Sequence, residues 1–234
     1  MNTRSLFKQG LAFGNEMNLS ISTLNKPCIE DKKVLKKENA TGSFEKYSAE
    51  FLIEYIINTH HAFAKENAVV IYNLIQKVAF RHSNRHSELK KLNEEAFFFF
   101  QDLLNQMLKE EQEFFPFISR SMKNFKHSNK RHSIDLHYFE EKIKLQEFEH
   151  AKSLNYLKVF REITNDYLVP PDASWNYISL FKKMQQLEQD LKMHFYLEDD
   201  VLFKKAFASE SEPRRQPEHK KVIAKSNIKS LKTE

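Results

Sequence analysis

The sequence predicts an all-α fold, an up-down-up-down antiparallel four-helix bundle, and three observations carry this prediction. The 234 residues include only 3 glycines, and all of them precede residue 43. Because tight turns and bulges usually recruit glycine, the long remainder of the chain favours helix. Apolar residues recur there at alternating steps of three and four, which places them on one face of a helix. The intervals between these periodic blocks are short enough to join antiparallel neighbours.

The first two helices are predicted over residues 47–80 and 87–117. The buried stripe of the first helix comprises His61, Ala64, Ala68, Ile71, Ile75, Val78 and His82. That of the second comprises Leu92, Ala96, Phe99, Leu103, Gln106, Glu110 and Phe117, and Pro116 marks the predicted end of this helix. The four phenylalanines at 97–100 surround the whole helix, which indicates either extra burial or a dimer face.

The last two helices are predicted over residues 133–164 and after residue 172, with connections near 81–86, 119–132 and 165–172. The stripe of the third helix comprises Leu136, Phe139, Ile143, Gln146, His150, Leu154 and Leu157. The fourth helix follows "VPPDASW", where Asp172 is the predicted N-cap after two prolines. Its stripe comprises Met184, Leu187, Leu191, His194, Glu198 and Val201.

Composition divides the chain into three parts: a flexible polar leader (1–44), the bundle (45–207) and a basic disordered tail (208–234). The net charge is +5 with a pI near 9.0, but much of the excess lies in the tail, which disfavours nucleic-acid binding by the bundle. No apolar run approaches the roughly 20 residues that span a bilayer. The single cysteine, Cys28, excludes a disulfide framework within the chain. A soluble protein of the reducing cytoplasm is expected.

Six polar side chains occupy core positions of the four stripes, and this is the main functional signal. They are His61, Gln106, Glu110, His150, His194 and Glu198. Burying such groups without partners costs several kcal/mol each, so something must compensate them. Distances along the helices from the turns bring all six to one layer of the bundle. Mixed imidazoles and carboxylates suit iron, manganese or zinc, and two bridging carboxylates suit a pair of metal ions.

At these residues the sequence resembles the hemerythrin-like di-iron proteins of the repair-of-iron-centres family. The resemblance runs from about Phe51 to Phe207 and depends on "IINTHH", "KVAFRHSNRHSEL", "QMLKEEQEFFPFI", "EFEHA", "PPDASW" and "HFYLEDDVLF". It implies that His61, His150 and His194 are iron ligands and that Glu110 and Glu198 bridge two iron ions. It also implies an outer carboxylate at Glu149. His82 matches a recurrent family histidine, but its distance from His61 along the helix excludes it from the metal site and favours a role at the turn.

The chain departs from the family pattern at two points that bear on chemistry. Gln106 stands where the family has a histidine, and an amide oxygen is a weaker, neutral ligand than an imidazole. One of the two iron positions could therefore be under-coordinated or empty. The short cysteine-containing domain that often precedes the bundle is not expected here, because the leader contains only Cys28.

Three functions remain open from the sequence. The family resemblance implies repair or protection of iron-sulfur and other iron centres under nitrosative or oxidative stress, with damaged iron-sulfur proteins as partners and a labile di-iron pair as possible iron donor. A hemerythrin-like module that binds or senses oxygen or nitric oxide is the second. A metal-free bundle that acts as a scaffold is the third. No catalytic residue is assigned, whether the chain is an enzyme is left open, and a homodimer is one possibility for its assembly.

Overall fold

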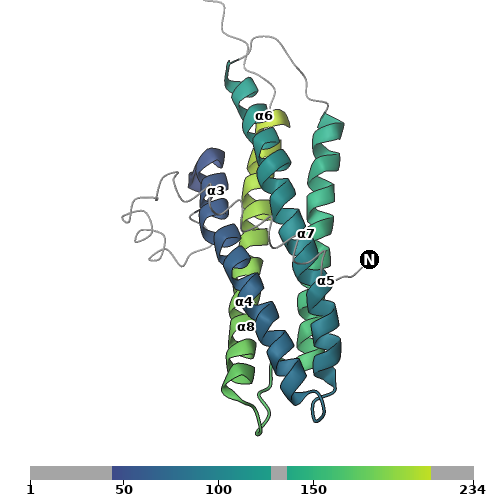
Figure 1. Ribbon diagram of the computed structural model, residues 1–234. Coiled ribbons are helices and arrows are strands. Elements are labelled where there is room, and N and C mark those ends of the chain that lie inside the picture. The colour runs from purple at the N-terminus through teal and green to yellow at the C-terminus, as the bar shows by residue number, and fades with distance from the viewer. Residues whose placement is uncertain (1–43, 128–135, 212–234) are drawn as a thin grey trace, which may run out of the picture.

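The computed structural model describes residues 44–127 and 136–211 of the chain, and Figure 1 draws the rest as a grey trace. The predicted leader and basic tail lie almost wholly outside the described residues. The described part is helical and forms the predicted four-helix bundle, in which consecutive long helices run antiparallel (Figure 1). The turns before α5 and before α8 lie at the same end of the bundle.

Each column of the bundle is one nearly continuous helix, and three of the four columns contain a π-helical segment. The first column comprises η1 (Phe44–Lys46), α3 (Ala49–Tyr55), η2 (Ile56–His61) and α4 (Ala62–His82). The second comprises α5 (Glu88–Lys109), η3 (Glu110–Phe114) and α6 (Phe115–His127). The third is α7 (Leu136–Thr164). The fourth comprises α8 (Trp175–Tyr196), η4 (Leu197–Phe203) and α9 (Lys204–Ser211).

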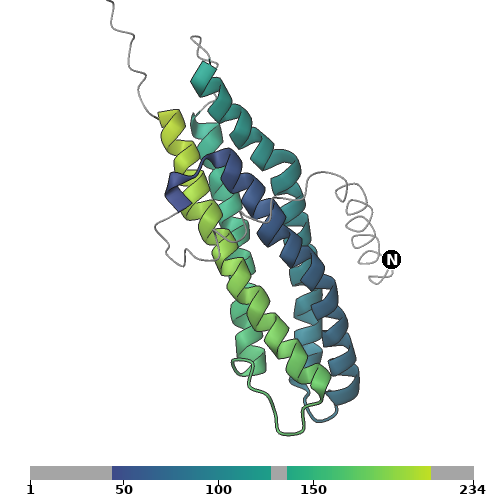
Figure 2. The same cartoon turned by 90° about the vertical axis from the view of Figure 1, so that its left-hand side faces the viewer.

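Two apolar clusters fill the interior, and a layer of buried polar residues separates them. On the first column, Ile56 belongs to one cluster and Ala64 to the other, with His61 between them. On the second column, Glu110 lies in the same way between Met107 and Phe114. The second cluster packs η1, α3 and α6 against η4 and α9, which Figure 2 shows gathered at the end of the bundle away from the two turns. Apolar packing on both sides therefore fixes the depth of the polar layer.

The stripes predicted from periodicity are buried along most of their length, but Leu154 is exposed and four other positions are only half-buried: His82, Phe117, Ile143 and Gln146. Leu154 is 40% exposed, and Ser153 takes the buried position because it faces Gln106. Phe117 is only half-buried, whereas Phe114 and Ile118 are buried. The π turns of η3 shift the register of the second column, because a π turn holds more residues than an α turn.

Pro116 does not end the second helix as predicted. It is the second residue of α6, and the helix continues to His127, well into the predicted connection at 119–132. Proline interrupts a regular helix because it lacks an N–H group and clashes with the carbonyl four residues earlier. The π turn of η3 directly precedes Pro116, so the proline follows an existing break in the regular hydrogen-bond ladder.

Asp172 is not the N-cap of the fourth helix. Ser174 precedes α8 in extended conformation, and its Oγ lies 2.9 Å from Nε2 of His82. Asp172 instead accepts a hydrogen bond from His86 at 2.9 Å and pairs with Arg85 at 3.4 Å. Both contacts join the first turn to the loop before α8. His82 thus lies at the turn, as the sequence predicts.

The phenylalanine run on α5 serves mainly burial. Phe99 and Phe100 are buried in the core and Phe97 packs against it, while Phe98 is 54% exposed. Among the described residues, no helix combines the length and the apolar character that crossing a membrane would require.

Candidate metal centre

The π-helical segments coincide with the polar layer of the bundle. His61 is the last residue of η2, Glu110 is the first of η3, and Glu198 is the second of η4. The structure brings all six predicted site residues into one network of contacts, and all six are 5% exposed or less. Single π turns inside α-helices recur at functional sites because they redirect side chains that a regular helix would keep on separate faces.

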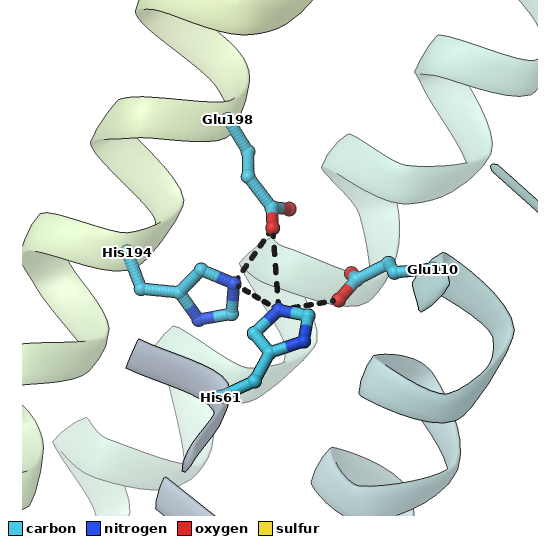
Figure 3. Close-up of side chains that lie close together, drawn as sticks. All are labelled: His61, Glu110, His194 and Glu198. Atoms are coloured by element: carbon cyan, nitrogen blue, oxygen red, sulfur yellow. Dashed lines mark hydrogen bonds and ion pairs between the residues drawn. The ribbon is translucent and has the colours of Figure 1, made fainter. Parts of the chain in front are cut away.

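Four side chains converge from three columns on one side of the site. His61, Glu110, His194 and Glu198 each offer a ligand-type atom, and these atoms lie within 4.8 Å of one another (Figure 3). The Nε2 atoms of the two histidines are 3.0 Å apart. Oε1 of Glu198 lies 2.7 Å from Nε2 of His194 and 3.6 Å from Nε2 of His61. Oε2 of Glu110 lies 3.4 Å from Nε2 of His61.

His150 and Gln106 occupy the other side of the two carboxylates. Nε2 of His150 lies 3.1 Å from Oε2 of Glu198 and 3.3 Å from Oε1 of Glu110. Each carboxylate therefore presents one oxygen to the pair His61 and His194 and its second oxygen to His150. This is the arrangement that two carboxylates need to bridge a pair of metal ions.

The amide of Gln106 is held by two hydrogen bonds. Its Nε2 donates to Oε1 of Glu110 at 2.8 Å, and its Oε1 accepts from the hydroxyl of Ser153 at 3.3 Å. In this orientation the amide nitrogen faces Glu110 and the amide oxygen faces Ser153. An imidazole at this position would supply a nitrogen in its place.

Two acidic residues next to the carboxylates orient the histidines from outside. Nδ1 of His61 donates to Glu111 at 2.7 Å, and Lys65 donates to the same carboxylate at 2.6 and 2.8 Å. Nδ1 of His150 donates to Asp199, also at 2.7 Å. A carboxylate on the outer nitrogen fixes the tautomer that leaves Nε2 facing a metal ion. Asp199, and not Glu149, contacts the outer nitrogen of His150, while Glu149 lines a cleft together with Gln106.

Burial and charged neighbours act in opposite directions on the pKa values of the site residues. Burial lowers the pKa of His61, but hydrogen bonds to Glu110, Glu111 and Glu198 outweigh burial and raise it well above the ordinary value. Burial likewise lowers the pKa of His150, and its carboxylate partners raise it to about 12. Burial lowers the pKa of His194. Although burial and mutual repulsion act against ionisation, the surrounding histidines lower the pKa of both Glu110 and Glu198.

Several nitrogen and oxygen atoms of this cluster lack a full set of hydrogen-bond partners. The facing Nε2 atoms of His61 and His194, 3.0 Å apart, have room for one proton between them. Nδ1 of His194 is buried without a partner. Oε2 of Glu110 and Oε2 of Glu198 are buried and make no well-aligned hydrogen bond, although they lie 3.4 Å from Nε2 of His61 and 3.1 Å from Nε2 of His150. Buried polar atoms are almost always satisfied, so a group of orphans at one place indicates a missing partner. A divalent metal ion fits this donor set of imidazole nitrogens and carboxylate oxygens.

A surface cleft of about 470 Å³ between α7 and the second column reaches the site. Gln106 is the one predicted site residue in its lining, which also includes Glu149 and Lys152. Lys109, Arg120 and Lys142 also line the cleft. The His150 side of the site is therefore the side nearer to solvent.

Sequence reasoning missed Glu111, Asp199 and His60. The first two directly follow a predicted bridging glutamate, and in a regular helix such a neighbour points about 100° away from the core. The signal was the acidic runs "EE" at 110–111 and "EDD" at 198–200, which look like solvated faces. His60, 4% exposed, contacts Asp190 at 3.0 Å, and only the second histidine of "IINTHH" was selected from the stripe.

Fold and site together define the class: a four-helix bundle whose buried layer of histidines and glutamates fits a metal centre. No family model matches the chain. The chain is similar to the iron-sulfur cluster repair protein ScdA of Staphylococcus epidermidis, with 27% identity over 82% of this chain and 85% of that protein. It is also similar to the iron-sulfur cluster repair protein YtfE of Escherichia coli, with 28% identity over 68% of this chain and 66% of that protein. These similarities confirm the resemblance to the repair-of-iron-centres family.

Proposed function

We propose that this chain is a non-haem di-iron protein that acts in the repair or protection of iron-sulfur centres under nitrosative or oxidative stress. The observation that carries the proposal is the arrangement of Glu110 and Glu198, each with one oxygen toward His61 and the other toward His150. The names of the similar proteins support the repair role. Damaged iron-sulfur proteins of the cytoplasm are the proposed partners.

The proposed positions differ in their ligands. His61 and His194 would hold one iron ion with an oxygen from each carboxylate, and His150 would hold the second with the other two oxygens. Iron in such a ligand set supplies redox chemistry and binds small ligands such as oxygen and nitric oxide. Glu111 and Asp199 keep the ring nitrogens oriented, and the flanking apolar clusters keep bulk water out of the layer.

The second position is the proposed source of donated iron. It has one imidazole where the first has two, because Gln106 offers its amide hydrogen to Glu110. Fewer strong ligands lower the affinity for iron, and the cleft beside Gln106 gives a recipient or a small ligand a way to approach. Iron released from this side would be cargo, and iron held by His61 and His194 would remain bound.

The experiment is metal content per chain, measured by mass spectrometry on protein purified without oxygen, with optical spectra before and after nitric oxide. Gln106→His is measured beside it, and Gln101→His, at an exposed position of α5, is the matched control. Two irons per chain with bands that respond to the gas support the proposal. One iron in the native chain and two only in Gln106→His support a di-iron scaffold whose second position is weak.

Two other outcomes would select a different function. Stable iron with gas-dependent spectra, but without transfer to apo iron-sulfur proteins, would favour a binding or sensing module. Absence of metal in all three proteins would favour a metal-free scaffold. One feature supports that scaffold: the raised pKa of His61 and of His150, with the lowered pKa of Glu110 and of Glu198, favours imidazolium–carboxylate pairs that would compensate the unloaded layer.

A further inference from the structure

His194 differs from the other two site histidines in its outer nitrogen. Nδ1 of His61 and Nδ1 of His150 each meet a carboxylate at 2.7 Å, whereas Nδ1 of His194 is buried and has no hydrogen-bond partner. When Nε2 of a neutral imidazole faces a metal ion, its proton must reside on Nδ1. A buried donor without an acceptor costs about 1–3 kcal/mol. His194 therefore lacks the carboxylate partner that His61 and His150 each have on Nδ1.

A second imidazole and carboxylate lie beside His194, and they also carry unsatisfied atoms. Nδ1 of His60 lies 3.0 Å from Oδ1 of Asp190, while Nε2 of His60 and Oδ2 of Asp190 are buried without partners. The ring of His60 is nearly parallel to that of His194, with 7° between the planes and 6.1 Å between the centroids. Asp190 precedes His194 by four residues on α8, which places both side chains on one row of the helix.

We propose that buried His60 and half-buried Asp190 together form the outer shell of His194 and hold its ring proton on Nδ1. His60 occupies one oxygen of Asp190 and thereby fixes the carboxylate, whose second oxygen is left as an acceptor. Because Nδ1 of His194 and Oδ2 of Asp190 do not bond each other directly, one bridging water would satisfy both, since a buried water needs two or more polar partners and these atoms provide them. The pair positions a ligand and is not itself a ligand. This inference rests on the proposed metal site.

The fold explains why this histidine needs a separate device. Glu111 and Asp199 reach their histidines from the residue after each bridging glutamate, across the π turns of η3 and η4. His194 and Glu198 share the fourth column, so the acid after Glu198 is directed toward His150 on α7. The π turn of η2 instead makes two consecutive residues, His60 and His61, face inward. His61 is the site histidine, and His60 contacts Asp190.

The test compares three outer carboxylates in the full chain loaded with zinc, which is diamagnetic. Asp190→Asn is measured beside Glu111→Gln and Asp199→Asn, with Asp200→Asn as the control because Asp200 is exposed and pairs only with Lys204 among the described residues. The readouts are zinc affinity in competition with a chelator and nitrogen-15 spectra of the histidine rings. Loss of an outer partner typically lowers metal affinity about 10–100-fold. Asp190→Asn should lower it by this factor, while Asp200→Asn should leave it unchanged.

The spectra separate positioning from mere stability. In the native chain we expect a protected Nδ1–H signal for His194, and both Asp190→Asn and His60→Gln should shift or broaden this signal while sparing that of His150. Melting of the unloaded variants and circular dichroism check that each is folded. Native affinity in Asp190→Asn, or an unchanged His194 signal in both variants, would overturn the inference. Failure of the native chain to bind zinc or iron would overturn the proposed function first, and the inference with it.

Discussion

Replacement of Glu198 by glutamine is expected to weaken the bundle both with and without metal. The carboxylate is fully buried and lies 2.7 Å from His194, 3.1 Å from His150 and 3.6 Å from His61. Glutamine keeps its volume but removes the negative charge that these histidines face. Breaking a buried charge pair costs about 3–5 kcal/mol. The lower end applies, because His150 keeps Glu110 and Asp199 as partners and His61 keeps Glu111.

The expected shifts follow from these energies. For a domain of this size, 1 kcal/mol corresponds to about 2–4 °C in melting temperature, so the unloaded variant should melt about 6–12 °C below the native chain. Metal at a hundred times its dissociation constant adds about 2.7 kcal/mol, which is about 5–11 °C. Glu198→Gln should lose this increment, because both proposed metal positions would share the carboxylate.

The assay is thermal unfolding followed by circular dichroism, with and without ferrous iron in the absence of oxygen, alongside metal content by mass spectrometry. Glu147→Gln, at an exposed position of α7, is the matched control and should behave as the native chain. A variant that binds iron with native stoichiometry and keeps its melting increment would refute the role of Glu198 as a bridge. An unloaded variant that melts with the native chain would refute the charge pairing in the empty layer.

Three further predictions test the site, its protons and its surroundings. Stability of the unloaded chain should fall as pH rises from 6.5 toward 12, since the pKa of His150 is raised to about 12 in the folded state. It should also fall as pH drops below 4.5, because the unfolded chain then binds protons that Glu110 and Glu198 resist in the folded state, where their pKa values are lowered. Urea unfolding across this pH range measures both effects. Iron affinity should increase with pH, by about tenfold per pH unit for each proton displaced, because His61 and His150 must release protons to bind metal. Iron titration at pH 6, 7 and 8 with a competing chelator measures this increase. The same affinity at all three pH values would indicate that no histidine is a ligand. Leu191→Ala, at a fully buried position of α8, should lower the free energy of unfolding by about 2–5 kcal/mol through the cavity it leaves. The number of bound irons should not change. Loss of iron from a folded variant would contradict the separation of core and site.

The regular part of the bundle could be predicted because its helices bury one stripe over many turns. Ala64 to Val78 on α4 and Met184 to Leu191 on α8 follow the three-four rhythm in the structure as in the sequence. His61, Glu110, His194 and Glu198 were identifiable because charged residues on such a stripe demand compensation. Short-range rules were less reliable at Pro116 and Asp172. A π turn before Pro116 let the helix continue, and Asp172 contacts His86 in the turn before α5 and does not cap α8.

The details of the site could not be predicted, because they depend on departures from regular helix. Periodicity assumes that every turn holds the same number of residues, and η2, η3 and η4 violate this assumption where the ligand-type residues lie. The wide turns bring His60 inward beside His61, and they direct Glu111 and Asp199 to histidines on other columns. Such contacts join residues about 50 or more positions apart, and no local pattern encodes them.

The sequence by itself determined the helical class, the four columns and the level at which imidazoles and carboxylates meet, because burial of one stripe on each helix is a local property of the residue order. The tertiary structure decided which side chains of that layer contact one another. Packing of the four columns placed Glu110 and Glu198 between histidines on two sides, gave His61 and His150 outer acids, and left Gln106 as a hydrogen-bond donor beside a cleft. The physical reason is that a side chain's partner depends on which helix faces it and at what rotation, and both are settled only when the four columns pack together.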